Sequence, residues 1–465
     1  MKLTRDIFIW AAPILAVVFT LGLKSIGLAS PAAITAGITL LTVIWWISEA
    51  IPIAAASLVP FALLPVFGIV DHKTIASALG SHVILLLMGA FMLAKALEKS
   101  GAHERLALYM LRAVGVSSGR RLVFGFMLAA GFLSMWISNT ATTLIMLPIA
   151  LAILSDIDNP KLRLALILGI AYASSVGGIG TPIGTPPNVI FMAIYEQQTG
   201  KEYNFLQWMK VGVPVVILSL PVMAFWLTRH VKLESDIQLP LPGIWRIEER
   251  RTLFVFGLTA LAWITRKAPY GGWSGALDMP LVGDSTIALF AVVVMFLVPN
   301  GKTDIVSDRK ERLLDWETAR SIPWGLLLLF AGGIAMAKGF TASGLSDMLG
   351  DWLSSLASLP LILMILTICL VVTYLTEITS NTATATLLMP ILAAAGVATG
   401  LDPALFMIPA AMAASCAFML PVATAPNAIA YGLGGITIRD MVKEGAILSL
   451  FVSVIIGGVC YILLA

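Results

Sequence analysis

The chain has 465 residues, of which 59% are hydrophobic and 12% are charged, and its formal net charge is +3. An ordinary soluble domain has roughly 25% charged residues, so this composition excludes a soluble globular protein and indicates a membrane protein. The three cysteines stand singly in apolar stretches and the four histidines have no metal-ligand spacing. We therefore expect neither a disulfide framework nor a zinc site, and no nucleic-acid partner.

Apolar runs long enough to cross about 30 Å of hydrocarbon recur along the whole chain. The first run follows Lys2 and Arg5, but no clean cleavage site of small residues comes after it, so we interpret it as a permanent helix. The sequence predicts an all-α polytopic membrane protein with about eleven crossings. These lie near residues 6–24, 33–50, 52–70, 82–99, 160–198, 208–228, 252–265, 284–298, 322–341 and 404–434, and at the carboxyl terminus.

Two apolar blocks, residues 121–154 and 359–397, are too long for one crossing and carry Ser-Asn-Thr at their centres. Basic residues flank the first block on both sides, which predicts a re-entrant hairpin that enters from the cytoplasm. The second hairpin is predicted to enter from outside. Since Lys- and Arg-rich loops stay in the cytoplasm, we expect a cytoplasmic amino terminus and a periplasmic carboxyl terminus. Residues 102–115 are expected to form an interfacial helix.

The chain contains an internal repeat. The letters "SNTAT" occur at residues 138–142 and 380–384, and "PIGTPPN" at 182–188 aligns with "PVATAPN" at 421–427. An odd number of predicted crossings separates the two copies, so the halves should be inverted relative to each other. Inverted repeats with interrupted helices are typical of secondary transporters.

The repeated motifs place polar groups and helix interruptions at membrane depth. Unpaired backbone is costly in hydrocarbon, so a chain interrupts a helix there only inside protein or beside a wet cavity. At an interruption, helix amino ends attract an anion, whereas carboxyl ends and unwound carbonyls attract a cation. The two tripeptides add neutral groups that can bind a carboxylate or a hard cation such as Na⁺. They are Ser138, Asn139, Thr140, Ser380, Asn381 and Thr382.

Small residues support the same interpretation. Gly184 and Ala423 hold equivalent positions in the two interrupted helices, where a minimal side chain lets a backbone carbonyl approach an ion. No Arg or Lys lies beside these motifs in the sequence to neutralise an anion, and burying an unpaired dianion is prohibitively costly. Co-bound sodium ions are therefore the expected counter-charge.

Other interpretations compete with this one. Ser and Thr in membrane helices often bond back to a carbonyl one turn earlier or hold helices together. Two copies at symmetry-related positions, each with an interrupted helix, favour the ion and substrate interpretation. Glu377, one turn before the second tripeptide, could be a proton or cation site or an acceptor for exposed hairpin backbone.

These motifs resemble the divalent anion/sodium symporter family, the sodium-dicarboxylate transporters that include the INDY proteins. The resemblance covers essentially the full chain, including the eleven-crossing, two-hairpin layout. The family's final Val is Ala430 here, Thr379 stands where some relatives have Ala, and Ala425 stands where many have Pro. The family signature runs here through Ser415, Phe418, Pro421, Val422, Ala423, Asn427 and Ile429.

The resemblance implies two sodium sites and one substrate site. The first sodium would lie among Ser134, Ser138, Asn139 and Gly184. The second would lie among Thr376, Thr379, Asn381 and Ala423. The substrate carboxylates would be held by Asn139, Thr140, Asn381 and Thr382, and we add to the substrate set Ser138, Ser380, Thr185, Thr424 and Ala425.

The resemblance also implies a homodimer with an elevator mechanism, in which a transport domain slides against a fixed scaffold. By analogy, the scaffold comprises residues 1–120, with the interfacial helix, and 251–358. The transport domain comprises residues 121–250, with the cytoplasmic-side hairpin, and 359–465, with the outside hairpin and the last helix.

We therefore predict sodium-coupled symport of a C4-dicarboxylate such as succinate, malate or fumarate, with at least two sodium ions, across a bacterial inner membrane. The alternatives are transport of sulfate, citrate or another divalent anion, and exchange without sodium. An intramembrane enzyme would need a catalytic dyad, and the sequence has none near the interruptions. A channel would need a continuous polar pore.

Overall fold

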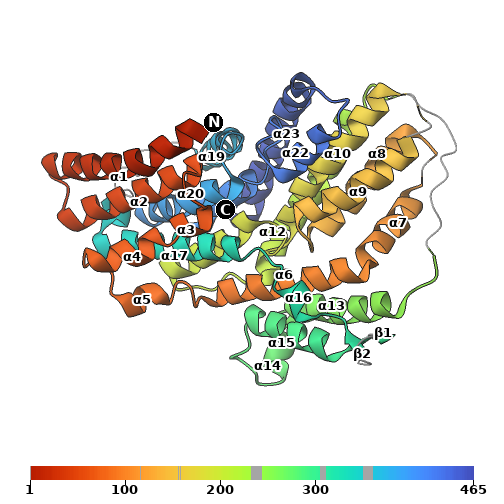
Figure 1. Cartoon of the computed structure of the whole chain (residues 1–465), viewed down its shortest axis with the longest axis horizontal. Helices are drawn as coiled ribbons and strands as arrows, with labels where there is room; N and C mark the ends of the chain where they lie inside the picture. Colours follow the sequence, from red (N-terminus) through yellow and green to blue (C-terminus); the bar gives the residue numbers. More distant parts are fainter. Residues whose placement is uncertain are drawn as a thin grey trace.

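The computed structural model describes residues 2–115, 117–154, 157, 159–231, 243–303, 310–348 and 360–465. These residues form an almost entirely helical bundle, in which α1–α5 lie at one end and α7–α10 at the other (Figure 1). The first helices are α1 Lys2–Ser25, α2 Ser30–Ser48, α3 Ile53–Ala56, α4 Val59–Val66, α5 His72–Ala76, α6 His82–Ser100 and α7 Ala102–Val114.

The next group contains the first predicted hairpin and the first interrupted helix. Its elements are α8 Gly119–Ser134, α9 Asn139–Leu154, α10 Pro160–Gly177, the 3-10 helix η1 Gly178–Gly180, α11 Pro186–Thr199 and α12 Phe205–Leu227. A second group without such interruptions follows. It consists of α13 Ile247–Thr265, α14 Gly272–Ala276, α15 Asp284–Leu297, β1 Pro299–Thr303, β2 Lys310–Arg312, α16 Trp316–Ala319 and α17 Trp324–Ser343.

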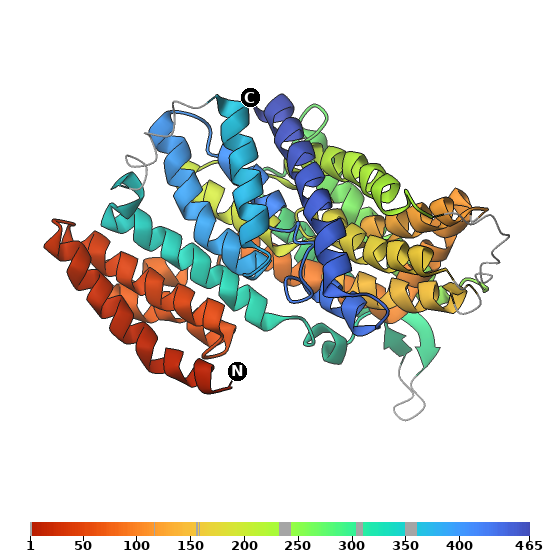
Figure 2. The same cartoon turned by 90° about the horizontal axis from the view of Figure 1, so that it is seen from above.

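The last group repeats the order hairpin, interrupted helix, long helix. Its elements are α19 Leu361–Leu375, α20 Asn381–Thr399, α21 Ala404–Ala413, α22 Ala425–Gly432 and α23 Ile438–Leu464. The two repeats interlock, because α22 packs on α9 and α10, α23 packs on α12, and α11 packs on α20 and α21. In Figure 2 the blue helices of the last group therefore run beside the yellow and green helices, while α1 and α2 pair at one side.

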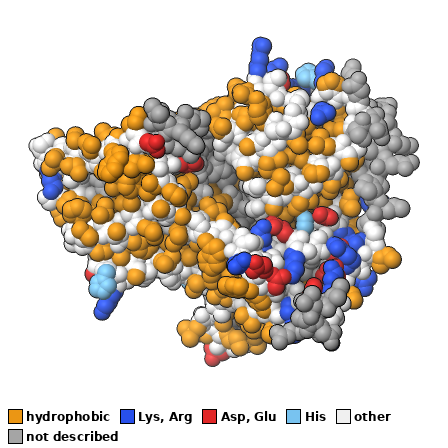
Figure 3. All heavy atoms as spheres, viewed as in Figure 1, with side chains coloured by type: hydrophobic (Ala, Val, Ile, Leu, Met, Phe, Trp, Pro, Cys, Tyr) orange, Lys and Arg blue, Asp and Glu red, His pale blue; other side chains and the backbone are white. Residues whose placement is uncertain are grey.

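The helix lengths agree with a multi-pass membrane protein. Among the described residues, seven helices are long and apolar enough to cross a membrane by length and composition. Figure 3 shows a mostly hydrophobic face, with charged side chains gathered where α13 and α16 lie. The spans are Asp6–Ser25, Ser30–Ser48, Pro160–Gly180, Phe205–Leu227, Trp324–Ser343, Asn381–Thr399 and Ile438–Leu464.

Three local features differ from the sequence-based expectations. The crossing predicted at 52–70 is two short helices, α3 and α4, because Pro60 lacks an N–H donor and its ring clashes with a helical carbonyl four residues earlier. The all-α prediction does not include the antiparallel strands β1 and β2. Residues 102–115 do form a helix, α7, which packs on α8; its position on the membrane surface stays a prediction.

The predicted domain boundaries do not coincide with helix ends. The boundary at 120/121 falls inside α8 and that at 250/251 falls inside α13. The boundary at 358/359 lies outside the described residues. Below, α8–α12 and α19–α23 are called the hairpin unit, and α1–α7 and α13–α17 are called the frame. The division into a moving and a fixed domain stays a prediction.

Candidate functional site

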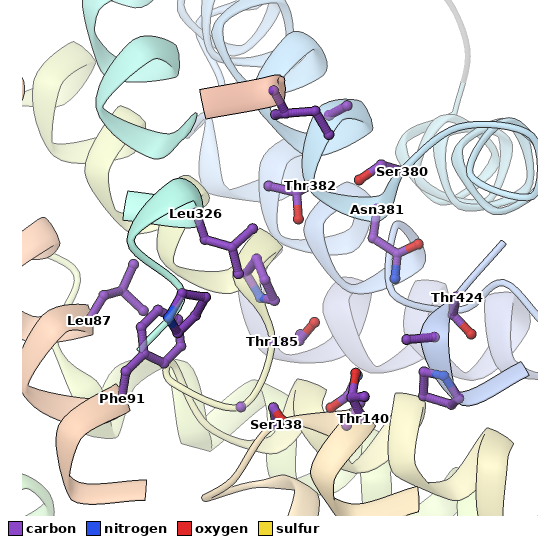
Figure 4. A pocket seen from close by; sticks show the side chains of 18 of the residues that line it. Leu87, Phe91, Ser138, Thr140, Thr185, Leu326, Ser380, Asn381, Thr382 and Thr424 are labelled. Atoms are coloured by element: carbon purple, nitrogen blue, oxygen red, sulfur yellow. The ribbon is translucent and has the colours of Figure 1, made fainter. Parts of the chain in front are cut away.

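Both tripeptides and both helix interruptions meet at one cavity of about 660 Å³. Ser138 and Thr140 approach it from one side and Asn381 and Thr382 from the other, with Thr185 between them (Figure 4). The two hairpin tips therefore face each other across the cavity. Of the predicted site residues, the cavity is lined by Ser138, Asn139, Thr140, Gly184, Thr185, Thr379, Ser380, Asn381, Thr382, Ala423, Thr424 and Ala425.

The two remaining predicted residues lie directly behind the tips. Ser134 is fully buried, and its hydroxyl donates to Asn139 Oδ1 at 2.6 Å. Thr376 is fully buried too, and its hydroxyl lies 2.8 Å from Asn381 Oδ1 and 3.0 Å from the carbonyl oxygen of Ala414. Each hairpin thus carries the same pair, a hydroxyl five residues before an asparagine amide. The structure brings all predicted site residues together, and their roles as ligands stay predictions.

The first interruption, residues 178–185, is buried along its whole length, and its backbone oxygens lie close together. A Cβ added at Gly184 would lie 2.5 Å from the Gly178 carbonyl oxygen and 2.9 Å from that of Ser134. A Cβ added at Gly178 would lie 2.7 Å from Asn139 Oδ1 and 3.1 Å from the Gly184 carbonyl oxygen. Glycine is required at both positions because these oxygens approach so closely. Such an all-oxygen set fits a hard cation such as Na⁺.

The second interruption, residues 414–424, is built differently. Glu377 Oε1 accepts from the N–H groups of Phe418 and Met419 at 2.6 and 2.9 Å, and Oε2 accepts from Leu420 N–H at 3.0 Å. Of the two roles considered for Glu377, the structure shows the backbone acceptor, but the backbone belongs to the interrupted helix and not to the hairpin. A carboxylate with three N–H donors is well satisfied at depth.

Two asparagines hold the interruptions in the same way. Asn188 Nδ2 donates to the carbonyl oxygens of Gly178 and Thr181 at 2.9 and 2.7 Å. Asn427 Nδ2 donates to those of Ala417 and Leu420, each at 3.0 Å. Both side chains are fully buried. Each amide therefore ties the start of the second half-helix to the unwound carbonyls that precede it.

Sequence reasoning marked only Asn427 of this pair, through the family signature. The repeated "TPPN" and "TAPN" could have found Asn188 as well, since the two asparagines stand at equivalent positions of the repeat.

Four helices begin at the cavity. The helices α9, α11, α20 and α22 start at Asn139, Pro186, Asn381 and Ala425, which all line it. The first turn of each helix has N–H groups without a partner inside the helix and carries positive partial charge. Together they create a favourable environment for an anion without any arginine at the tips.

The frame supplies the opposite wall, which sequence reasoning missed. Leu87, Phe91 and Lys95 of α6 line the cavity together with Leu326 of α17. Lys95 Nζ lies 2.6 Å from Glu98 Oε2, so a cation does line the cavity even though none is adjacent to the motifs in the sequence. Only packing between distant segments shows that these residues face the hairpin tips.

Two hairpins and two interrupted helices around one central cavity define the molecule as a membrane transporter. Comparison with known proteins agrees with this class. Residues 43–406 match the family described as "Citrate transporter". The sodium-dependent dicarboxylate transporter SdcS of Staphylococcus saprophyticus is 41% identical over 475 residues, which cover 97% of this chain and 90% of that protein. The SdcS protein of Staphylococcus aureus is 42% identical over 448 residues, 91% of this chain and 84% of that protein.

The chain therefore belongs to the divalent anion/sodium symporter family, as the sequence motifs predict. The YdaH transporter of Alcanivorax borkumensis has a similar fold, with a TM-score of 0.57 over 92% of this chain and 98% of that chain. At 14% identity this likeness concerns the fold alone.

Proposed function

We propose that this protein is a sodium-coupled symporter of C4-dicarboxylates such as succinate, malate and fumarate. The similarity over nearly the whole chain to transporters named sodium-dependent dicarboxylate transporters supports this proposal. The single structural observation that carries it is the pair of facing tips, each with an asparagine held by a buried hydroxyl.

The two tips suit a substrate with a carboxylate at each end. Asn139 and Thr140 would hold one carboxylate and Asn381 and Thr382 the other, with donors that are neutral side chains and helix amino ends. Ser138, Ser380, Thr185, Thr424 and Ala425 complete the lining of the cavity. Neutral donors bind a dianion weakly by themselves, because much of its charge stays unbalanced.

Sodium would supply the missing charge. One ion fits the oxygens of Ser134, Ser138, Asn139 and Gly184, and a second fits those of Thr376, Thr379, Asn381 and Ala423. Each set includes a carbonyl or amide oxygen of a helix interruption or tip, which suits Na⁺. With two positive charges beside it, a dicarboxylate is neutralised at the moment of binding, so we infer that substrate binds well only after at least two sodium ions.

We propose an elevator mechanism in which the hairpin unit slides against the frame, within a homodimer in a bacterial inner membrane. The cavity lies between these two parts, so relative movement would expose it to either side. The distribution of Lys and Arg supports a cytoplasmic amino terminus. In that orientation the cavity opens to the cytoplasm, because its lining includes Trp46, Lys95 and Ser321 near the cytoplasmic ends of α2, α6 and α17.

Citrate is a second candidate substrate, because the family whose description matches residues 43–406 is "Citrate transporter". A cavity of about 660 Å³ has space for either molecule. The number of carboxylates would then decide the preference, since a third carboxylate needs a further donor or cation.

Uptake of radiolabelled succinate into proteoliposomes tests the proposal. We expect accumulation that requires an inward sodium gradient and that is inhibited by malate and fumarate more strongly than by citrate or sulfate. Asn139→Ala and Asn381→Ala should each abolish this uptake without preventing membrane insertion. Uptake that is indifferent to sodium would refute the coupling, and stronger inhibition by citrate would favour the second candidate.

A further inference from the structure

A group of charged residues joins the hairpin unit to the frame just beyond the ends of α11 and α13. Glu202 lies in the connection between α11 and α12. Its Oε1 is 2.5 Å from Arg266 Nη2, and its Oε2 is 2.5 Å from Lys267 Nζ. Both cations follow directly after α13 of the frame. One carboxylate thus bridges two neighbouring cations across the boundary between the two parts. We call Glu202, Arg266 and Lys267 the Glu202 cluster.

The frame holds the Glu202 cluster in place. Arg266 is only 3% exposed, and its Nε lies 2.7 Å from Asp284 Oδ1, while its Nη1 donates to the Val282 carbonyl at 3.0 Å. Asp284 Oδ2 in turn accepts from the backbone N–H of Phe205, the first residue of α12, at 3.0 Å. The α11–α12 connection is therefore joined to the frame through Glu202 and, directly after it, through the first residue of α12.

Two further contacts join the same parts at the same end. His82, the first residue of α6, lies with Nε2 3.2 Å from Glu196 Oε2 near the end of α11. Gln198 Nε2 donates to Thr341 Oγ1 near the end of α17 at 3.1 Å. The cavity lining reaches the other end of α6 and α17, where it includes Lys95 and Ser321. These polar contacts between the two parts thus occur at the end of α6 and α17 that the cavity lining does not reach.

We infer that the Glu202 cluster is an electrostatic latch that stabilises the conformation with the cavity open beside Lys95, and that it must break in each transport cycle. This inference rests on the proposed sliding of the hairpin unit. If the hairpin unit slides so that the cavity opens at the end where the Glu202 cluster lies, the α11–α12 connection moves away from the end of α13. Both ion pairs of Glu202, with Arg266 and with Lys267, are then lost together. Glu202 is a positioning residue, since it touches neither the cavity nor the predicted ligands.

Removing the charge of Glu202 tests the inference. We expect Glu202→Gln to increase several-fold the fraction of molecules whose cavity is open at the latch end. The measurement is the rate at which a membrane-impermeant maleimide, added at that side, modifies a cysteine placed at Phe91 in the cavity wall. The native cysteines Cys369, Cys416 and Cys460 are all buried. Glu317→Gln is the matched control, because Glu317 pairs with Arg320 on the frame alone.

A covalent link gives the complementary result. With cysteines at Glu202 and Lys267, a short bifunctional maleimide cleavable by reductant should abolish succinate uptake, and cleavage should restore it. Sodium-dependent binding of succinate to the linked protein in detergent should remain as in the unlinked protein. A linked protein that still transports, or a Glu202→Gln variant with wild-type labelling, would overturn the latch. Failure of sodium-dependent binding in the wild-type chain would instead refute the proposed function.

Discussion

The two helix interruptions hold the same place in the repeat, yet they are stabilised by different groups. At the first, Trp208 Nε1 donates to the Ile179 carbonyl at 2.7 Å and the Thr181 hydroxyl donates to the Met135 carbonyl. At the second, the Glu377 carboxylate accepts three backbone N–H groups. Beyond the carbonyls that the two asparagines bond, the first interruption has a further carbonyl that accepts from Trp208, whereas the second has three N–H groups that donate to Glu377.

What the interruptions share is the position of the oxygens near the tips. The Ser134–Asn139 and Thr376–Asn381 pairs match, and so do the carbonyls bonded by Asn188 and Asn427. The comparison indicates that the repeat retains the positions of these oxygens, which we propose as cation ligands. The groups that satisfy the remaining backbone differ between the halves, because any acceptor or donor of the right sign can satisfy it.

The largest effect is expected from a substitution at Gly184, which would displace the backbone oxygens of the first interruption. In Gly184→Ala the new Cβ would overlap the backbone oxygens of Gly178 and Ser134, which belong to packed helices and cannot move aside easily. We expect sodium-dependent succinate uptake to fall to background, with the protein still inserted in the membrane. The matched variant Ala423→Gly removes a methyl group at the equivalent position and should retain most uptake; equal loss in both would contradict this explanation.

The second prediction concerns the Glu377 carboxylate, the acceptor that stabilises the second interruption. In Glu377→Gln the side-chain oxygen can still accept, but the NH₂ group faces a backbone N–H and leaves it without an acceptor. Each such buried group costs about 1–3 kcal/mol, so the thermal unfolding temperature should fall by several degrees and the sodium concentration for half-maximal uptake should rise. Glu317→Gln, which changes an exposed ion pair of the frame away from the cavity, is the control. A Glu377→Gln variant with unchanged stability would show that its three hydrogen bonds contribute little.

Glu377 also shows which features of the site could not be predicted from the sequence. The hairpins, the interruptions and the facing asparagines could be predicted, because a repeated polar motif inside apolar segments has few explanations. The partners of Glu377 could not, since Phe418, Met419 and Leu420 stand far along the chain and offer backbone atoms, which carry no residue-specific signal.

The frame side of the cavity escaped prediction for a related reason. Leu87 and Phe91 occur in an apolar helix whose composition resembles every other span, and Lys95 looks like an ordinary helix-end cation. Which face of α6 borders the hairpin tips depends on packing between distant segments. The division of the 52–70 crossing into two helices could have been predicted, because Pro60 stands in the middle of the run.

The third prediction tests what the interruptions share. Asn188→Ala and Asn427→Ala each remove two hydrogen bonds from unwound carbonyls, worth about 1 kcal/mol apiece. If the two halves hold their cation oxygens alike, both variants should raise the sodium concentration for half-maximal uptake by a similar factor, on the order of tenfold. Sodium titrations of succinate uptake measure this directly. A strong effect at one position and none at the other would show that the shared hydrogen bonds serve different purposes.

The smallest expected effect removes one donor from the first interruption. Trp208 is fully buried and packs against the ring of Phe191 in a tilted arrangement. Trp208→Phe therefore keeps most of the packing but leaves the Ile179 carbonyl without its donor. One unsatisfied carbonyl costs about 1 kcal/mol, which predicts a small fall in unfolding temperature and a change of about twofold in sodium dependence. The Thr181 hydroxyl and the Asn188 amide still hold the same turn in this variant. At the second interruption, by contrast, Glu377 alone accepts from three N–H groups. The loss of stability in Trp208→Phe should therefore be smaller than that in Glu377→Gln. The reverse order would mean that the first interruption depends on Trp208 as strongly as the second depends on its carboxylate.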